Sequence, residues 1–154
     1  MMLYIKFSLI FFLIHLACYI IAGIIDLQLA KKMYKGKNRL YKSFLRDTDN
    51  IKESTRIAKL MIPSQLIRAL LMSVVLYPIL PYLIQLPFWT QFIFMAGLMF
   101  IYADFASAIP FSNTIEGIIY LKKEFVEKKV FWTIQLEAMI YSIMFGLLSA
   151  LFLF

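Results

Sequence analysis

Apolar residues gather in four long segments of this chain, and charged or turn-forming residues separate them. The segments cover about residues 7–30, 60–80, 88–109 and 130–154. A transmembrane helix needs about 20 predominantly apolar residues to cross a hydrocarbon core of about 30 Å. The pattern therefore predicts an all-α, polytopic membrane protein, a four-transmembrane-helix bundle that forms a single membrane domain.

The two polar links carry the same helix-start pattern. Asn50 is followed three residues later by Glu53, and Asn113 is followed three residues later by Glu116. Such pairs are typical of a capping box at a helix amino terminus. We therefore expect the second long helix to begin directly after Asn50. The second pair predicts a short cytoplasmic amphipathic helix, roughly over residues 114–129, on the membrane surface.

Positive charge is concentrated in the same two links. The chain has 16 Lys and Arg against 9 Asp and Glu, and most of the basic residues lie within residues 31–59 and 113–129. By the positive-inside rule both links are cytoplasmic and both termini are non-cytoplasmic. The run from Lys31 to Arg46 also contains aromatic residues, which predicts a contact with anionic lipid headgroups.

The overall composition excludes several classes of protein. Hydrophobic residues make up 62% of the chain, charged residues only 16%, and the mean hydropathy is +0.80. A soluble domain has about 25% charged residues, so a soluble enzyme, a disordered tail and a fibrous repeat are disfavoured. Cys18 is the only cysteine, and the chain has no glycine-rich phosphate loop. No disulfide, cofactor, metal or nucleic-acid partner is therefore predicted.

Four ionisable residues interrupt the apolar segments. Asp26, Arg68, Asp104 and Glu137 each lie about 6–12 Å from the end of a segment that adjoins a basic link, at 1.5 Å per residue. Each would cost about 2.5–3.5 kcal/mol at the centre of a bilayer. We therefore expect the four side chains to turn inward and meet at one level, and they are the predicted ion- or substrate-binding residues.

Helical phase supports this convergence and adds secondary candidates. His15 falls in the same sector of the first helix as Asp26, and Tyr141 shares a stripe with Glu137 on the last helix. We expect His15 to be a hydrogen-bonded packing residue. Glu116 is the acid or base candidate outside the spans.

The charge layer has a structural and a functional explanation. Arg68 paired with Asp104 or Glu137 would fix the relative positions of the helices. Alternatively, the layer binds an ion, a proton or a substrate. If all three carboxyl groups were ionised, the layer would hold a net charge of −2 with Arg68. At least one carboxyl is therefore expected to be protonated, paired with a lysine or occupied by a cation.

Three functions follow from these features. The first is non-enzymatic assembly, as a homo-oligomer or with a larger membrane protein, because a stripe of Ser142, Gly146 and Ala150 suits close helix contact. The second is a small cation- or proton-linked transporter or channel that uses the carboxylate layer. The third is an interfacial enzyme on a lipid or lipophilic substrate, with Arg68 holding an anionic head. We expect the first, since the sequence shows no catalytic constellation.

Overall fold

The protein is built from helices, and no strand occurs among the residues that the computed structural model describes, 2–29, 46, 49–108, 111–126 and 128–154. Four helical stretches are long and apolar enough to cross a membrane. Both findings confirm the predicted all-helical class and the number of candidate spans. The elements in chain order are α1 (Met2–Leu29), α3 (Ile51–Leu76), α4 (Leu80–Leu83), α5 (Phe88–Gly97), the π-helix η1 (Leu98–Phe105), α6 (Ile115–Tyr120), the 3-10 helix η2 (Lys123–Phe125) and α7 (Lys128–Phe152).

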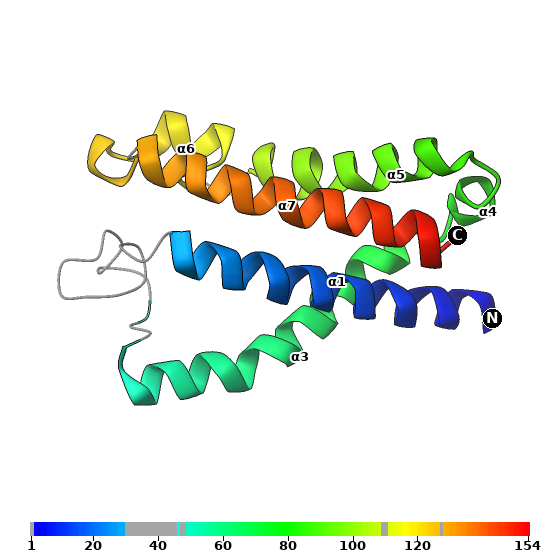
Figure 1. The fold of residues 1–154 in the computed structure, drawn as a ribbon, viewed down its shortest axis with the longest axis horizontal. Helices are drawn as coiled ribbons and strands as arrows, with labels where there is room; N and C mark the ends of the chain where they lie inside the picture. The colour runs from blue at the N-terminus through cyan, green and yellow to red at the C-terminus, as the bar shows by residue number, and fades with distance from the viewer. Residues whose placement is uncertain (1, 30–45, 47–48, 109–110, 127) are drawn as a thin grey trace.

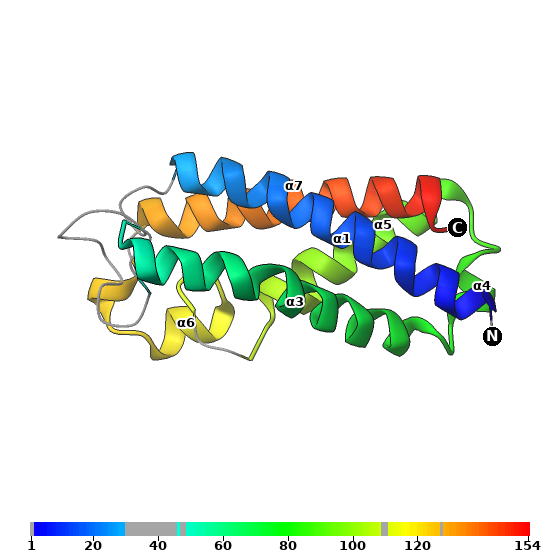
Figure 2. The same cartoon turned by 90° about the horizontal axis from the view of Figure 1, so that it is seen from below.

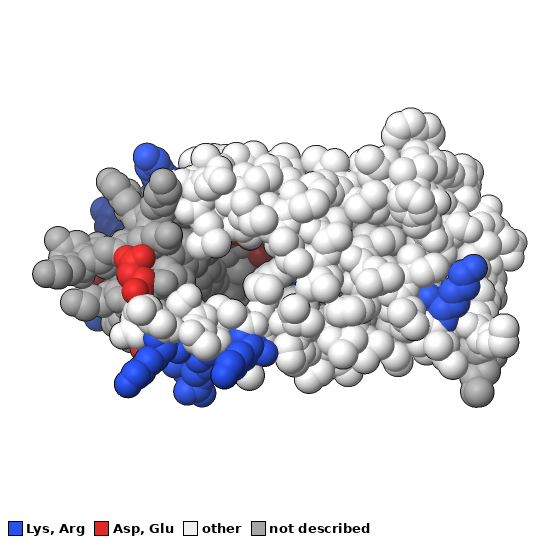
Figure 3. Space-filling model, turned by 60° about the horizontal axis from the view of Figure 1, so that its bottom comes forward, with Lys and Arg blue, Asp and Glu red and all other residues white. Residues whose placement is uncertain are grey.

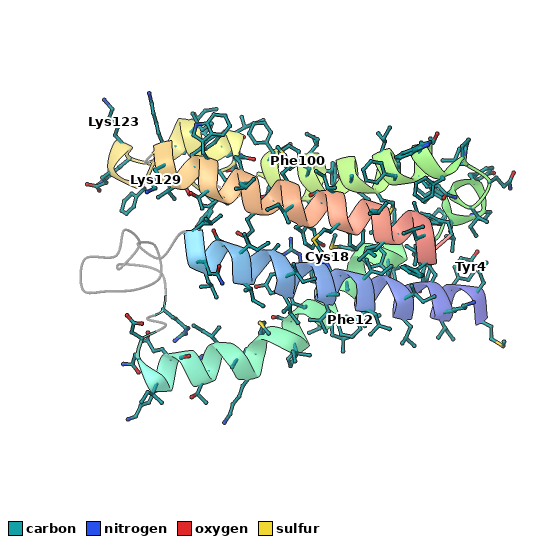
Figure 4. All side chains as sticks on the ribbon, viewed as in Figure 1. Tyr4, Phe12, Cys18, Phe100, Lys123 and Lys129 are labelled. Atoms are coloured by element: carbon teal, nitrogen blue, oxygen red, sulfur yellow. The ribbon has the colours of Figure 1, made fainter. Side chains whose placement is uncertain are left out.

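The long helices lie side by side. α1 packs against both α3 and α7, and α7 packs along α5 and η1 (Figure 1 and Figure 2). Both chain termini lie at the end of the structure that holds α4, whereas α6 lies at the opposite end. Figure 4 shows the same polarity, with Tyr4 at the terminal end and Lys123 and Lys129 at the other.

The centre of the structure is apolar and aromatic. Phe11 of α1 and Phe145 of α7 are both 0% exposed, and their ring centroids lie 5.1 Å apart. Met95 of α5 and Cys18 of α1 are also fully buried in this core. The core therefore lies where α1, α5 and α7 meet.

The outer faces of the helices are apolar as well. Leu71, Ile93 and Trp132 are each at least 65% exposed. Figure 3 shows a broad surface without charged side chains next to an end that is rich in Lys and Arg. Soluble monomers rarely expose apolar patches of this extent, so the surface is typical of an integral membrane protein.

The start of α3 confirms the capping prediction. The Asn50 side-chain oxygen accepts hydrogen bonds from the backbone N–H groups of Lys52 at 3.0 Å and Glu53 at 3.4 Å, and the helix begins at Ile51. These bonds satisfy amide groups that have no partner within the helix. Pro63 lies inside α3, which continues to Leu76.

The small-residue stripe of α7 is buried within the chain. A Cβ atom added to Gly146 would lie 2.7 Å from the Phe92 backbone oxygen and 2.8 Å from the Ala96 Cβ, both on α5. Ser142 and Ala150 are also buried. Gly146 therefore lies at a close α5–α7 contact inside the protein.

Two predictions about the third segment and the following link are wrong. The third segment is not α-helical to residue 109, because it changes to a π-helix at Leu98 and ends at Phe105. The single helix expected over residues 114–129 is replaced by the short α6 and η2.

The reason lies in the turn before α6. The cap of α6 is Thr114, whose side chain accepts from the Gly117 N–H at 2.9 Å, and not the expected Asn113. Gly117 lies so close to the Phe111 carbonyl that a Cβ there would overlap it. α6 then ends at Tyr120, because Leu121 has an extended backbone.

Candidate functional site

A cavity of about 220 Å³ lies between α1, α3, η1 and α7, and we call it the polar cavity. Figure 3 shows a hollow in the surface beside the basic end, with acidic atoms at its wall. The polar side chains that line the cavity come from all four helices and from the turn before α6. They are His15, Tyr19, Arg68, Asp104, Asn113, Glu137, Tyr141 and Ser142.

The structure brings the four main predicted residues together. Arg68, Asp104 and Glu137 line the polar cavity directly. Asp26 is 3% exposed, and its carboxyl group lies within electrostatic range of Glu137. The structure thus places charged side chains from four helices near one another. Glu116, in the first turn of α6, does not line the polar cavity.

Asp26 and Glu137 are neighbouring acids. Their carboxyl groups lie within electrostatic range of each other. Two like charges in a low-dielectric site repel each other. The Asp104 carboxyl lies within electrostatic range of Glu137, so a third acid adjoins this pair.

Asp104 is held by a polar relay that the sequence did not indicate. The side-chain amide of Asn113 donates to Asp104 Oδ1 at 2.7 Å, and the side-chain amide of Gln135 donates to the Asn113 carbonyl at 2.6 Å. Asn113 and Gln135 are both buried. The sequence pattern predicts Asn113 as a helix cap. A short-range pattern contains no information on the fold of this turn back onto η1, so the bond to Asp104 was not predictable.

The π-helix places Asp104 at the wall of the polar cavity. α5 enters η1 directly, and Asp104 is its penultimate residue. π-helical turns are rare and frequently occur at functional sites. The π-helical backbone at Asp104 differs from the α-helical spacing that the sequence predicts.

Arg68 faces the cavity without an ion-pair partner among the residues that the structure describes. Its guanidinium lies within electrostatic range of Asp104, His15 and Tyr141. The side chain as a whole remains exposed in the isolated chain. The structural explanation, in which Arg68 is locked to one carboxylate, is therefore not the arrangement observed.

A hydrogen-bonded group centred on His15 forms the inner wall of the cavity. His15 Nδ1 bonds to the Tyr141 hydroxyl, and His15 Nε2 lies 2.9 Å from Gln65 Oε1. Gln65 Oε1 is an acceptor, so Nε2 carries the hydrogen in this assignment of the amide. The expectation that His15 is a hydrogen-bonded packing residue is confirmed, and Gln65 is an additional participant.

The arrangement combines acids, a guanidinium and an imidazole around one space. Such a set of groups can hold a proton, exchange it between acids and balance the charge of an occupant. Among the residues that the structure describes, no three His, Cys, Asp or Glu side chains are grouped so that they could hold a metal ion. No protein-family model, curated protein or solved structure matches this chain.

Proposed function

We propose that α1, α3, α5 with η1, and α7 cross the membrane as a four-helix bundle. The basic end, with the short α6, lies at the cytoplasmic face, and both termini lie outside. Lys122, Lys123, Lys128 and Lys129 are all near α6 and η2, whereas Lys6 is the basic residue at the terminal end. The positive-inside rule supports this orientation.

Within this orientation the protein is a small proton-linked transporter that uses the polar cavity. The single observation that carries the proposal is that two carboxyl groups, Asp104 and Glu137, line the same cavity as Arg68. The two carboxyl groups come from η1 and α7, so their affinity for a proton depends on how these helices are positioned. A change in helix packing would alter proton affinity, which is the coupling that a transporter needs.

Charge balance favours the binding of one proton. Among the charged groups that line the polar cavity, Arg68 carries one positive charge and ionised Asp104 and Glu137 carry two negative charges, which leaves a net charge of −1. A net charge is unfavourable in a low-dielectric site. Uptake of one proton makes the group neutral. The lack of a three-residue metal-ligand group in the described part of the chain favours a proton over a metal cation.

The polar cavity is separated from the terminal end by the apolar core. Phe11 and Phe145 are fully buried next to the His15–Tyr141 contact. The proposed state is therefore one in which protons enter from the basic end only. Transport requires that α1 and α7 rearrange around this core.

One feature behind the assembly hypothesis lies within the chain. Ser142, Gly146 and Ala150 are all buried, and Gly146 packs closely against α5. The other support of the hypothesis, the missing catalytic constellation, is unchanged. Assembly through another surface stays a prediction.

Proton binding is tested with the full-length protein in liposomes. Glu137→Gln and Asp104→Asn each remove a proton-binding group with little change in shape, and we expect proton flux to fall by about 100-fold or more. Glu124→Gln is the matched control, because Glu124 is exposed on η2. Unchanged flux in both cavity variants would exclude the mechanism.

A second readout does not depend on knowing a transported substrate. Infrared spectroscopy detects the C=O stretch of a protonated carboxylic acid. We expect this band in the wild-type protein near neutral pH, and we expect Glu137→Gln to remove it while Glu124→Gln keeps it. A spectrum without such a band in the wild-type protein would contradict a protonated carboxyl group at the polar cavity.

A second candidate function is an interfacial enzyme on an anionic lipophilic substrate. The observation that favours it is Arg68, which lines the cavity without an ion pair to a described residue. Arg68→Gln would then abolish turnover of extracted lipids, whereas Glu116→Gln would not, because Glu116 lies outside the cavity. Loss of proton flux in Glu137→Gln, together with no lipid conversion by the wild-type protein, would favour the transporter.

A further inference from the structure

A second hollow lies between α1 and the amino-terminal half of α3. Its volume is about 280 Å³, and we call it the arginine groove. In Figure 1 this half of α3 diverges from α1 toward the basic end. The groove is lined by Tyr19 of α1, by Arg46 and by residues of α3 from Arg56 to Gln65.

The wall of the arginine groove changes from charged to apolar along α3. Leu60 lies four positions after Arg56, so both side chains lie on one face of the helix, about one turn apart. Ser64 continues the same face by one further turn, and Ile57 and Met61 also line the groove. The order is thus guanidinium, aliphatic side chains and a hydroxyl group, over about 12 Å at 1.5 Å per residue.

Both guanidinium groups are available to a ligand. Neither Arg46 nor Arg56 has a hydrogen bond or ion pair within the described part of the chain. Guanidinium groups bind phosphate oxygens with paired, directional hydrogen bonds. Two of them beside an apolar wall are complementary to a molecule with an anionic phosphate and a hydrocarbon chain.

We propose that the arginine groove binds an anionic phospholipid. Arg46 and Arg56 hold the phosphate and headgroup, and one acyl chain lies along Ile57, Leu60 and Met61. A soluble phosphate compound would not use the aliphatic wall, which is why a lipid is the favoured occupant. The proposal rests on membrane insertion but not on the proton chemistry of the polar cavity.

The groove and the polar cavity are neighbours in the fold. Tyr19 lines both of them, and Gln65 of the groove bonds to His15 of the cavity. The bound lipid therefore lies against the same segment of α1 that forms the cavity wall. Loss of the lipid site and loss of proton flux can be measured separately, because they involve different charged residues.

The test is native mass spectrometry of the full-length protein with phosphatidylglycerol, which is anionic, or phosphatidylcholine, which carries no net charge. Arg56→Gln and Arg46→Gln should each weaken phosphatidylglycerol retention by about tenfold, the effect of losing one charge-assisted hydrogen bond. Lys59→Gln is the matched control, because Lys59 is on the same helix but does not line the groove.

Leu60→Ala separates the lipid from a simple phosphate. It keeps both arginines and shortens the apolar wall at an exposed residue, so the protein should fold and still lose phosphatidylglycerol retention. Arg56→Lys retains charge without the paired donors and should lose part of the binding, which covers the case in which Arg56→Gln does not fold.

Several results would overturn the proposal. Equal retention of phosphatidylglycerol in Arg56→Gln and Lys59→Gln would exclude the site. Equal retention of the two lipids by the wild-type protein would exclude selection for anionic charge. Inorganic phosphate that displaces phosphatidylglycerol completely, with no effect of Leu60→Ala, would show that the groove binds phosphate alone.

Discussion

At the terminal end of the helices, Ser8, Ser73 and Tyr77 form a neutral hydrogen-bonded group that we call the hydroxyl cluster. The Ser8 hydroxyl lies 2.7 Å from that of Ser73 and 2.6 Å from that of Tyr77. At the opposite end, the polar cavity gathers a guanidinium and several acids around open space. Both regions join α1 to its neighbours, but only one of them leaves room for an occupant.

The comparison shows how neutral and charged side chains differ in the partners that they need within one fold. Hydroxyl groups donate and accept, so three of them satisfy one another in a small volume. One guanidinium and three carboxyl groups cannot all be satisfied without an extra proton or ion. The hydroxyl cluster is therefore suited to joining helices, and the polar cavity is suited to exchange.

The largest expected effect comes from truncating Phe11, whose apolar side chain lies between the hydroxyl cluster and the polar cavity. Phe11 lies three residues after Ser8 and four before His15, and it is fully buried. Phe11→Ala should destabilise the protein by about 3 kcal/mol, the lower end of the values for such truncations. It should also raise proton leak, because the apolar separation is lost.

Leu13→Ala is the control for Phe11→Ala, because Leu13 is on the same helix and 55% exposed. Denaturation in detergent micelles, followed by circular dichroism, gives the free energy of unfolding of each variant. Similar losses in both variants would show that Phe11 is not a core residue.

A smaller effect is expected at the α5–α7 contact, away from the hydroxyl cluster. Gly146→Ala places a Cβ within 3.0 Å of α5 atoms and should cost about 1–3 kcal/mol. Gly23→Ala is the control, because its Cβ would meet nothing within 4 Å. Equal free energies of unfolding for Gly146→Ala and Gly23→Ala in the same denaturation measurement would contradict the close packing of Gly146 against α5.

The two regions can be compared directly with a pair of tyrosine variants. Tyr77→Phe and Tyr141→Phe each remove one hydroxyl and should each cost about 1 kcal/mol. Only Tyr141→Phe should change proton flux, because Tyr141 bonds to His15 at the polar cavity. A change in flux with Tyr77→Phe at equal stability would contradict the division between the regions.

The smallest effect is expected at Glu116. It lies in the first turn of α6 and does not line the polar cavity. Glu116→Gln should cost about 0.3 kcal/mol through the lost interaction with the helix dipole. Proton flux measured in liposomes should be unchanged, in contrast with Glu137→Gln.

Local signals in the sequence were sufficient for much of the fold. Hydropathy predicts the four long helical stretches, and Asn50 predicts the start of α3, because both depend on residues that are close in sequence. The convergence of Arg68, Asp104 and Glu137 was also predictable, since charged residues at matching depths in apolar helices have a strong reason to face one another.

Other features depend on contacts between distant segments and were not predictable. The π-helix around Asp104 and the use of Asn113 as its donor follow from the turn before α6 folding back onto η1. The choice between an internal and an external contact for Gly146 depends on which helix lies beside α7.

The amino-acid sequence by itself thus determined the all-helical class and the number of apolar helices, because hydropathy and helical periodicity are local properties. Only the tertiary structure decided that Asp104 accepts a hydrogen bond from Asn113, that His15 bonds to Tyr141 and Gln65, and that Arg68 faces open space. The physical reason is that rotation and crossing of packed helices set these distances. No pattern within one helix contains that information.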